Sequence, residues 1–313
     1  MKSSTTKNKT VKKMSEKETI AVEKTGKENM YFDNRVIIVD KPPGLTSHEV
    51  TTLIKKMFKV KRAGHAGTLD PEVSGVLPIA LGRATKLIQY IASKEKTYIA
   101  LARFKKEMRE KEVETLFQKY KGVITQTPPK ISAVRKIPRQ RKIEKLEILE
   151  KRDRLVLFEA QVEAGTYIRT LCEDIGKETD GGRMEELRRI RVGKIDESRA
   201  HNMNEIQYAL NKFENGDEKL ITKMLNFPED LIELPKVMIK KSAINSIKNG
   251  AQIMIPALER IYGSPSIRSN VKIYCDKEFV GIGTLMISEE DLIKNKKGIA
   301  IKMERMHYLH TSL

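Results

Sequence analysis

Short β-branched runs and helical stretches alternate along the chain in an irregular order. Residues 36–39 are all apolar and β-branched, which predicts a buried strand. Residues 75–81 are also strand-like, and we expect a short helix directly after them. Apolar residues alternate with other residues from Val156 to Val162, the pattern of a strand that is buried on one face. A further helix is expected over residues 170–178, with glycines just past its end.

Capping signals support this order of elements. Thr46 and Glu49 have the spacing of a capping box, which predicts a helix from there to about Phe58. The irregular mixture of strands and helices favours an α+β fold with a mixed, largely antiparallel sheet over a doubly wound one.

The last quarter of the chain has a different pattern, and we expect a domain boundary near Leu234-Pro235. Ser242 is expected to cap a short helix that Gly250 ends, and Ser288 to cap another. Between them, short strand-like pieces are separated by glycine turns and cover residues 252–255, 271–274 and 281–287. This pattern predicts a small β-barrel of roughly 80 residues, a plausible size for a domain.

The charge balance indicates the kind of partner. The 313 residues include 60 Lys and Arg against 42 Asp and Glu, a formal net charge of +18. Such an excess favours a polyanion, and because no apolar run of about 18 residues and no signal-type segment is present, we expect RNA rather than a membrane. Residues 1–33 are expected to form a basic, disordered tail, either a solvated end or an arm that contacts RNA.

Cysteine and histidine usage gives no sign of a metal centre. Cys172 and Cys275 are the only cysteines and lie far apart, so we expect two reduced packing residues. The five histidines have no set of Cys or acidic partners around them, and no bound metal is predicted.

One carboxylate lies in an unusual setting. Asp70 ends a stretch of small residues, Gly64-His65-Ala66-Gly67-Thr68-Leu69, and precedes Pro71. Asp before Pro is common in turns, so a structural role is one interpretation. The other is a nucleophile that acts on a nucleotide drawn in by the surrounding cations.

Five motifs, taken together and in order, resemble the TruB/dyskerin family of RNA pseudouridine synthases, from about Val36 to the C-terminus. They are Asp40-Lys41-Pro42-Pro43-Gly44-Leu45-Thr46-Ser47, the Asp70 loop, Lys96-Thr97-Tyr98, Gly165-Thr166-Tyr167-Ile168-Arg169 and Leu187-Arg188-Arg189-Ile190-Arg191-Val192-Gly193. The resemblance implies a mixed-sheet catalytic domain over residues 34–234 and an RNA-binding PUA domain over residues 235–313.

The resemblance also implies the catalytic residues. Asp70 matches the family's catalytic aspartate, Arg169 the arginine that pairs with it, and Tyr98 the active-site tyrosine. Without the family match, Arg169 could be an exposed arginine at a helix start and Tyr98 a core residue of a strand. The reaction conserves bond energy, so no cofactor is expected.

The same comparison assigns the substrate pocket. Tyr167, Ile168 and Leu187 would supply its walls, although Ile168 and Leu187 could also be plain core residues. His65 matches a histidine beside the space that the flipped base vacates. Lys41 and Pro42 match the first motif and are expected to support the catalytic loop.

Two basic clusters are candidate RNA contacts, and solvated surface is the alternative for each. The first is a short basic link before the next strand and contains Arg135, Lys136, Arg139, Arg141 and Lys142. The second lies at the edge of the catalytic domain and contains Arg188, Arg189 and Arg191. Each phosphate contact would add to a steep salt dependence of RNA binding.

The short link is typical of the archaeal, dyskerin-type branch, which the resemblance associates with H/ACA guide RNA, accessory ribonucleoproteins, rRNA and tRNA. Thr97 stands where that branch usually has Glu, which keeps a standalone synthase acting on the TΨC arm of tRNA as the alternative. A non-catalytic RNA scaffold is the alternative from another class. We expect neither DNA nor a membrane as partner, and a cytoplasmic location, nucleolar if the chain is eukaryotic.

Overall fold

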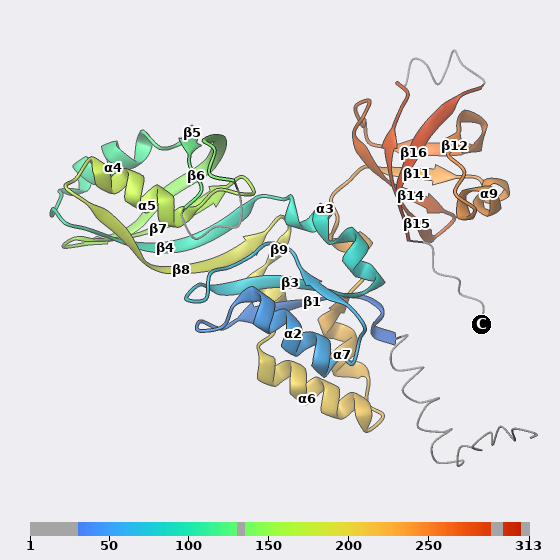
Figure 1. The fold of residues 1–313 in the computed structure, drawn as a ribbon, viewed down its shortest axis with the longest axis horizontal. Helices are drawn as coiled ribbons and strands as arrows, with labels where there is room; N and C mark the ends of the chain where they lie inside the picture. The colour runs from blue at the N-terminus through green and yellow to red at the C-terminus, as the bar shows by residue number, and fades with distance from the viewer. Residues whose placement is uncertain (1–30, 130–134, 289–296, 308–313) are drawn as a thin grey trace, which may run out of the picture.

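The computed structural model describes residues 31–129, 135–288 and 297–307, which form two β-sheets with helices on them (Figure 1). The predicted basic tail lies almost wholly outside these residues. The strands of the first sheet are β1 (Asn34–Lys41), β2 (Ala63–His65), β3 (Ser74–Gly82), β4 (Lys96–Phe104), β5 (Gly122–Gln126), β6 (Arg139–Arg152), β7 (Leu155–Val162), β8 (Gly182–Val192), β9 (Ile195–Asp196) and β10 (Leu225–Asn226). Their order is β10-β1-β3-β8-β4-β7-β6-β5, with β2 on β3 and β9 on β8.

Helices cover two separate parts of this sheet. They are α2 (Ser47–Met57), α3 (Ile88–Ala92), α4 (Glu110–Gln118), α5 (Ile168–Lys177), α6 (Met203–Glu214), α7 (Lys219–Met224) and α8 (Pro228–Leu231). Apolar residues of α2, α6 and α7 pack with those of β1 and β3, whereas α4 and α5 pack with β4, β6 and β7. The predicted α+β fold with a mixed sheet is confirmed.

Several local predictions are also confirmed. The capping box of Thr46 and Glu49 is present at the start of α2. In β7 the residues Val156, Phe158, Ala160 and Val162 are buried, as the alternation predicts. The basic link was predicted wrongly in part, because Arg139, Arg141 and Lys142 lie in β6 and not before it.

The two parts of the sheet meet where β3 pairs with β8 in parallel, at Ser74 with Arg188 and Gly75 with Arg189. Gly75 has φ +107°, and a Cβ there would lie 2.1 Å from the backbone oxygen of Arg189. Only glycine permits both this conformation and this close approach. The junction therefore requires glycine at position 75.

The second sheet contains β11 (Lys236–Ile239), β12 (Ile253–Met254), β13 (Leu258–Tyr262), β14 (Asn270–Cys275), β15 (Glu278–Leu285) and β16 (Ile299–Met306). Its order is β12-β16-β15-β14-β11-β13, and the helix α9 (Ile244–Lys248) accompanies it. Ser242 does not cap α9, because the residue at the N-cap is Ala243 and Ser242 lies in a preceding 3₁₀ turn. The helix predicted after Ser288 lies outside the described residues.

The second sheet contacts the first. Phe279 and Ile282 of β15 belong to the same apolar cluster as Val36 of β1 and Leu231 of α8. The imidazole Nε2 of His307, just after β16, is hydrogen-bonded to Asn34 Oδ1 at the start of β1. Both groups are buried, so this polar contact lies inside the interface between the sheets.

Candidate active site

Asp70 and Arg169 form an ion pair. Asp70 lies in the loop between β2 and β3, and Arg169 is the second residue of α5. Arg169 Nη2 lies 2.7 Å from Asp70 Oδ2 and 3.9 Å from Glu72 Oε2. The Asp70 backbone also accepts from Val73 in a turn, so the structural and the functional interpretations of this residue are compatible.

A cavity of about 480 Å³ opens beside this pair. Its volume falls in the range of small-ligand sites. It brings together six of the residues predicted for the catalytic centre and the substrate pocket, namely Asp70, Tyr98, Tyr167, Ile168, Arg169 and Leu187. Tyr98 comes from β4, Leu187 from β8 and the others from the Asp70 loop and the start of α5, so the wall combines four separate segments.

Lys41 and Pro42 do not line this cavity but lie behind the Asp70 loop. The side chain of Lys41 is fully buried, and its Nζ donates to the Pro42 and Pro71 carbonyls at 2.8 and 3.0 Å. The Gly44 N–H donates to the same Pro71 carbonyl at 2.8 Å. This part of the first motif therefore holds the chain immediately after Asp70.

Ser47 holds the chain immediately before Asp70. Its buried hydroxyl donates to the Leu69 carbonyl at 3.0 Å and accepts from the Leu69 N–H at 2.8 Å. Sequence reasoning did not select Ser47 for this role, although it belongs to the first motif. A carboxylate on a loop held on both sides is preorganised, which lowers the cost of orienting it during a reaction.

His65 lies at the end of β2, opposite Ile79 of β3, and is not among the residues that line the cavity. Burial, followed by the charges of Arg189 and His48, lowers the pKa of His65, so a neutral imidazole is favoured there. Its Nδ1 is buried and has no hydrogen-bond partner among the described residues.

Two cavity residues were not predicted to lie in the pocket: Lys96 was given no role, and Arg189 was assigned to a surface that contacts RNA. Lys96 and Arg189 both line the cavity, with 5% and 1% of their surface exposed. Burial, with a smaller effect of the Arg189 charge, lowers the pKa of Lys96 to about 8. Strand periodicity could have predicted that Arg189 lines the pocket. Leu187 and Arg189 lie on one face of β8 and Arg188 on the other.

The prediction that the second basic cluster contacts RNA is therefore wrong in part. Arg189 was predicted to contact RNA at the surface, but it is buried and points into the protein. Arg188 lies 2.9 Å from both Asp40 Oδ1 and Glu197 Oε2, so its charge is already paired. Arg191 is exposed and remains a candidate RNA contact.

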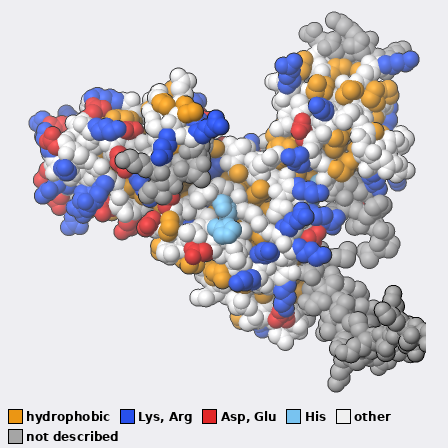
Figure 2. All heavy atoms as spheres, viewed as in Figure 1, with side chains coloured by type: hydrophobic (Ala, Val, Ile, Leu, Met, Phe, Trp, Pro, Cys, Tyr) orange, Lys and Arg blue, Asp and Glu red, His pale blue; other side chains and the backbone are white. Residues whose placement is uncertain are grey.

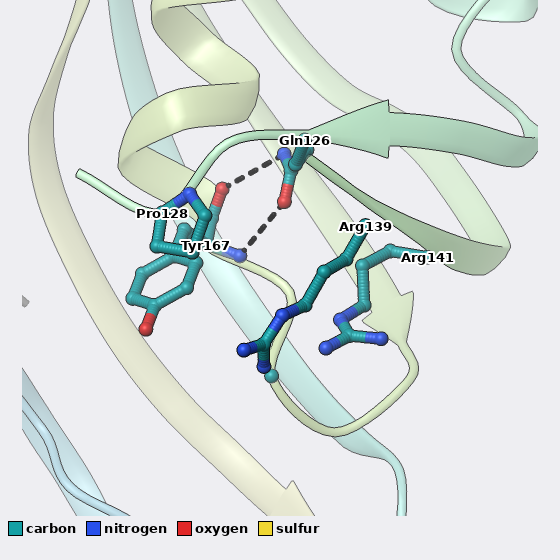
Figure 3. A pocket seen from close by; sticks show the side chains of 6 residues that line it. Gln126, Pro128, Arg139, Arg141 and Tyr167 are labelled. Atoms are coloured by element: carbon teal, nitrogen blue, oxygen red, sulfur yellow. Dashed lines mark hydrogen bonds between the residues drawn. The ribbon is translucent and has the colours of Figure 1, made fainter. Parts of the chain in front are cut away.

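The first basic cluster borders the cavity. Arg139 and Arg141 of β6 extend side by side over the backbone near Gly165, where they line a small hollow with Gln126, Pro128 and Tyr167 (Figure 3). Gly165 and Tyr167 line the larger cavity as well. Arg141 is paired with Glu163 at 3.6 Å, Lys142 with Glu144 at 2.7 Å, and Arg135 and Lys136 are exposed.

Cys172 and Cys275 are buried free thiols. Within the described ranges, no three His, Cys, Asp or Glu side chains cluster as metal ligands would. Among those same residues, no helix is long and apolar enough to span a bilayer. Lys and Arg side chains are spread over both parts of the molecule on the face seen in Figure 2.

Comparison with protein families places this chain in a known class. The profile of the TruB family pseudouridylate synthase N-terminal domain matches residues 55–168. That of the tRNA pseudouridylate synthase B C-terminal domain matches residues 169–232, and that of the PUA domain residues 235–307. The chain is therefore of the pseudouridylate synthase class, enzymes that isomerise uridine in RNA.

Similar proteins show to which family of this class the chain belongs. A probable tRNA pseudouridine synthase B of Archaeoglobus fulgidus is 38% identical over 281 residues, which cover 88% of this chain and 86% of the relative. One of Pyrococcus abyssi is 41% identical over 282 residues, with 88% and 84% covered. The Cbf5 chain of a Cbf5-Nop10-Gar1 complex is 38% identical, with a TM-score of 0.83 and 89% and 86% covered. This chain belongs to the TruB family of pseudouridine synthases.

Proposed function

We propose that this synthase works as the catalytic subunit of an H/ACA guide-RNA ribonucleoprotein and modifies uridines in rRNA. Solved relatives in a Nop10-Cbf5 complex and in an H/ACA particle bound to substrate RNA support this, at 36% identity and TM-scores of 0.80 and 0.81. Accessory subunits of the Nop10 and Gar1 kind, and a kink-turn-binding protein, are the partners that such a particle implies.

The paired carboxylate carries the chemical part of the proposal. With a uridine extruded into the cavity, Asp70 is the nucleophile next to the ribose or the uracil ring, and Arg169 holds its carboxylate at 2.7 Å. Isomerisation breaks the bond from C1′ to N1 and forms one from C1′ to C5, while C5 loses a proton and N1 gains one. Nothing is added to the nucleoside, so the chain's own side chains suffice.

The basic residues beside the cavity fit the backbone of the target strand. Arg139 and Arg141 lie on one face of β6, next to the cavity rim at Gly165. Arginine is suited to phosphate because its planar group donates two parallel hydrogen bonds. We assign these two residues to the RNA that flanks the extruded uridine.

A standalone enzyme that modifies the TΨC arm of tRNA is the second candidate. It is favoured by the names of the sequence relatives and by the match of residues 169–232 to the tRNA pseudouridylate synthase B C-terminal domain.

Tritium release from RNA labelled at C5 of uridine separates the two candidates. The purified chain is incubated with a tRNA transcript alone, and then with an rRNA fragment, a two-hairpin guide RNA and the accessory proteins. We expect release from the rRNA fragment only when the guide is present. Release from tRNA alone, with none from the guided fragment, would favour the standalone enzyme, and the Asp70→Asn variant is the inactive control for both.

A further inference from the structure

Arg189 is an unusual arginine. It is the largest of the fully buried side chains, with 1% of its surface exposed, yet it lines the cavity. No carboxylate among the described residues forms an ion pair with it. A buried charge without a counter-ion is costly, so its retention calls for a reason beyond packing.

The contacts of Arg189 connect three parts of the site. Its Nε donates to the Val76 carbonyl of β3 at 2.8 Å, and its Nη2 donates to the Gly67 carbonyl at 3.0 Å. Tyr98 of β4 is the direct partner of Arg189 across the β4–β8 pairing, and both side chains line the cavity. Burial lowers the pKa of Arg189, and the neighbouring Tyr98 partly opposes this. Gly67 lies in the loop that carries Asp70, so Arg189 adjoins both that loop and Tyr98.

We propose that Arg189 is a positioning residue for the proton transfer at C5, because its guanidinium fixes the Tyr98 hydroxyl relative to the Asp70 loop. The inference rests on the proposed isomerisation of uridine. After the bond from C1′ to C5 forms, the C5 proton leaves and its electron pair returns to the ring. Tyr98 is the base that takes this proton after losing its own to solvent, and N1 takes a proton from solvent.

Of the charged side chains around Tyr98, Arg189 is the one that can position its hydroxyl. The charged residues that line the same cavity are Lys96, Asp70, Glu163, Arg169 and Arg189. Asp70 is paired with Arg169, and Glu163 with Arg141. The Lys96 ammonium donates at 2.5 Å to the Ala92 and Lys94 carbonyls. Arg189, which lies opposite Tyr98 across the β4–β8 pairing, is therefore the cation of this set that is left to position the Tyr98 hydroxyl.

The first test needs no RNA. The protein is labelled with ¹³C at the ζ carbon of tyrosine, and the Tyr98 resonance is identified by its loss in Tyr98→Phe. We expect Arg189→Met to move this resonance, because the Tyr98 hydroxyl loses the guanidinium beside it. Arg103→Gln is the matched control, since it removes an exposed guanidinium from β4, the strand of Tyr98, outside the cavity. An unmoved resonance in folded Arg189→Met would overturn the proposal.

The second test separates proton transfer from loop support. Single-turnover conversion is measured with RNA that carries hydrogen or deuterium at C5. We expect Arg189→Met to slow conversion by about 10²-fold or more, with unchanged RNA affinity and a C5 isotope effect larger than in the wild type. Slower conversion without a larger isotope effect would mean that Arg189 only supports the loop, and the proposal would be wrong.

Arg189→Lys is a second variant that tests the proposal if Arg189→Met does not fold. It retains the charge but not the planar fork, so we expect a rate between those of the wild type and an inactive variant, and a moved Tyr98 resonance. A wild-type rate with an unmoved resonance would overturn the proposal. If the wild-type chain converts neither guided rRNA nor tRNA, the proposed function fails, whereas the resonance still decides whether Arg189 fixes Tyr98.

Discussion

Arg169 Nη2 and Asp70 Oδ2 lie 2.7 Å apart and join the loop before β3 to the first turn of α5. The carboxylate is half-exposed at the cavity wall, and the guanidinium selects one orientation for it. Because the loop is held independently by Lys41 and Ser47, this ion pair orients the side chain more than the backbone. The pair can therefore be disrupted without unfolding the loop.

Replacing Arg169 should reduce catalysis and leave the fold intact. Arg169→Met removes the partner of the Asp70 carboxylate, and we expect single-turnover conversion to fall by about 10²–10³-fold with little change in RNA affinity. Arg169→Lys should retain more activity, since it keeps the charge. Equal loss of RNA affinity and of rate would instead assign Arg169 to RNA binding.

Ser47 provides a test of loop preorganisation. Ser47→Ala leaves the N–H and the carbonyl of Leu69 without their partner, which should lower the free energy of unfolding by about 1–3 kcal/mol and slow conversion. Thr51→Val is the matched control, because the buried Thr51 hydroxyl donates to the Ser47 carbonyl within α2 and does not touch the loop. Similar rates for the two variants would show that the Ser47 contact is dispensable. Urea unfolding and single-turnover assays give the two readouts.

Two glycines with similar backbone conformations should respond differently to alanine. Gly44 has φ +92° with no atom near a Cβ, so Gly44→Ala should cost about 1–2 kcal/mol in unfolding free energy from backbone strain alone. Gly75→Ala adds a clash at 2.1 Å with the Arg189 carbonyl, so we expect a loss of about 4 kcal/mol or more. Thermal unfolding measures both, and equal losses would mean that β3 and β8 are not tightly joined.

His307 should make stability depend on pH. Burial, with the charges of Arg83 and Lys86, lowers the pKa of His307 to about 4, against about 6.5 in the unfolded chain. Between these values the unfolded state binds the extra proton, so the contribution is complete above pH 6.5 and is lost as pH falls toward 4.

From pH 7 to pH 5 the wild type should therefore lose about 2 kcal/mol more unfolding free energy than His307→Asn. A variant of the exposed His48 is the control and should behave as the wild type does. Urea unfolding at the two pH values checks this, and equal losses in the wild type and His307→Asn would contradict it.

Arg139 and Arg141 should contribute to RNA affinity through phosphate. Changing either to Gln should weaken binding of different RNA sequences to a similar degree and reduce the slope of log affinity against log salt by about 1. Arg103→Gln, away from the cavity, should leave the slope unchanged. Filter-binding titrations over a range of salt measure these slopes, and slopes unaltered by either substitution would exclude phosphate contacts.

Local features of the fold follow from short stretches of the sequence. The β-branched run at residues 36–39, the capping box of Thr46 and Glu49, and the alternation from Val156 to Val162 all predicted elements that are present. Each element depends on neighbouring residues and on the spacing of apolar positions, so the sequence is enough to predict it. Arg139 and Lys142 were placed before a strand and not in it, because their charges gave no strand signal.

Local sequence patterns could not predict which distant strands pair. Arg188 and Arg189 are adjacent and identical, yet one forms surface ion pairs and the other lies buried between the Asp70 loop and Tyr98. Which face of β8 is interior depends on its pairing with β3 and β4, segments far away in the chain.

The order of residues along this chain was enough to indicate its elements, its basic character, its family and the carboxylate that we propose as its nucleophile, because these depend on residue type and local spacing. Tertiary structure alone decided that Arg189 is buried, that Ser47 holds the Asp70 loop, and that His307 lies in the interface between the sheets. Those roles arise from contacts between distant segments, and no local pattern encodes which segments meet.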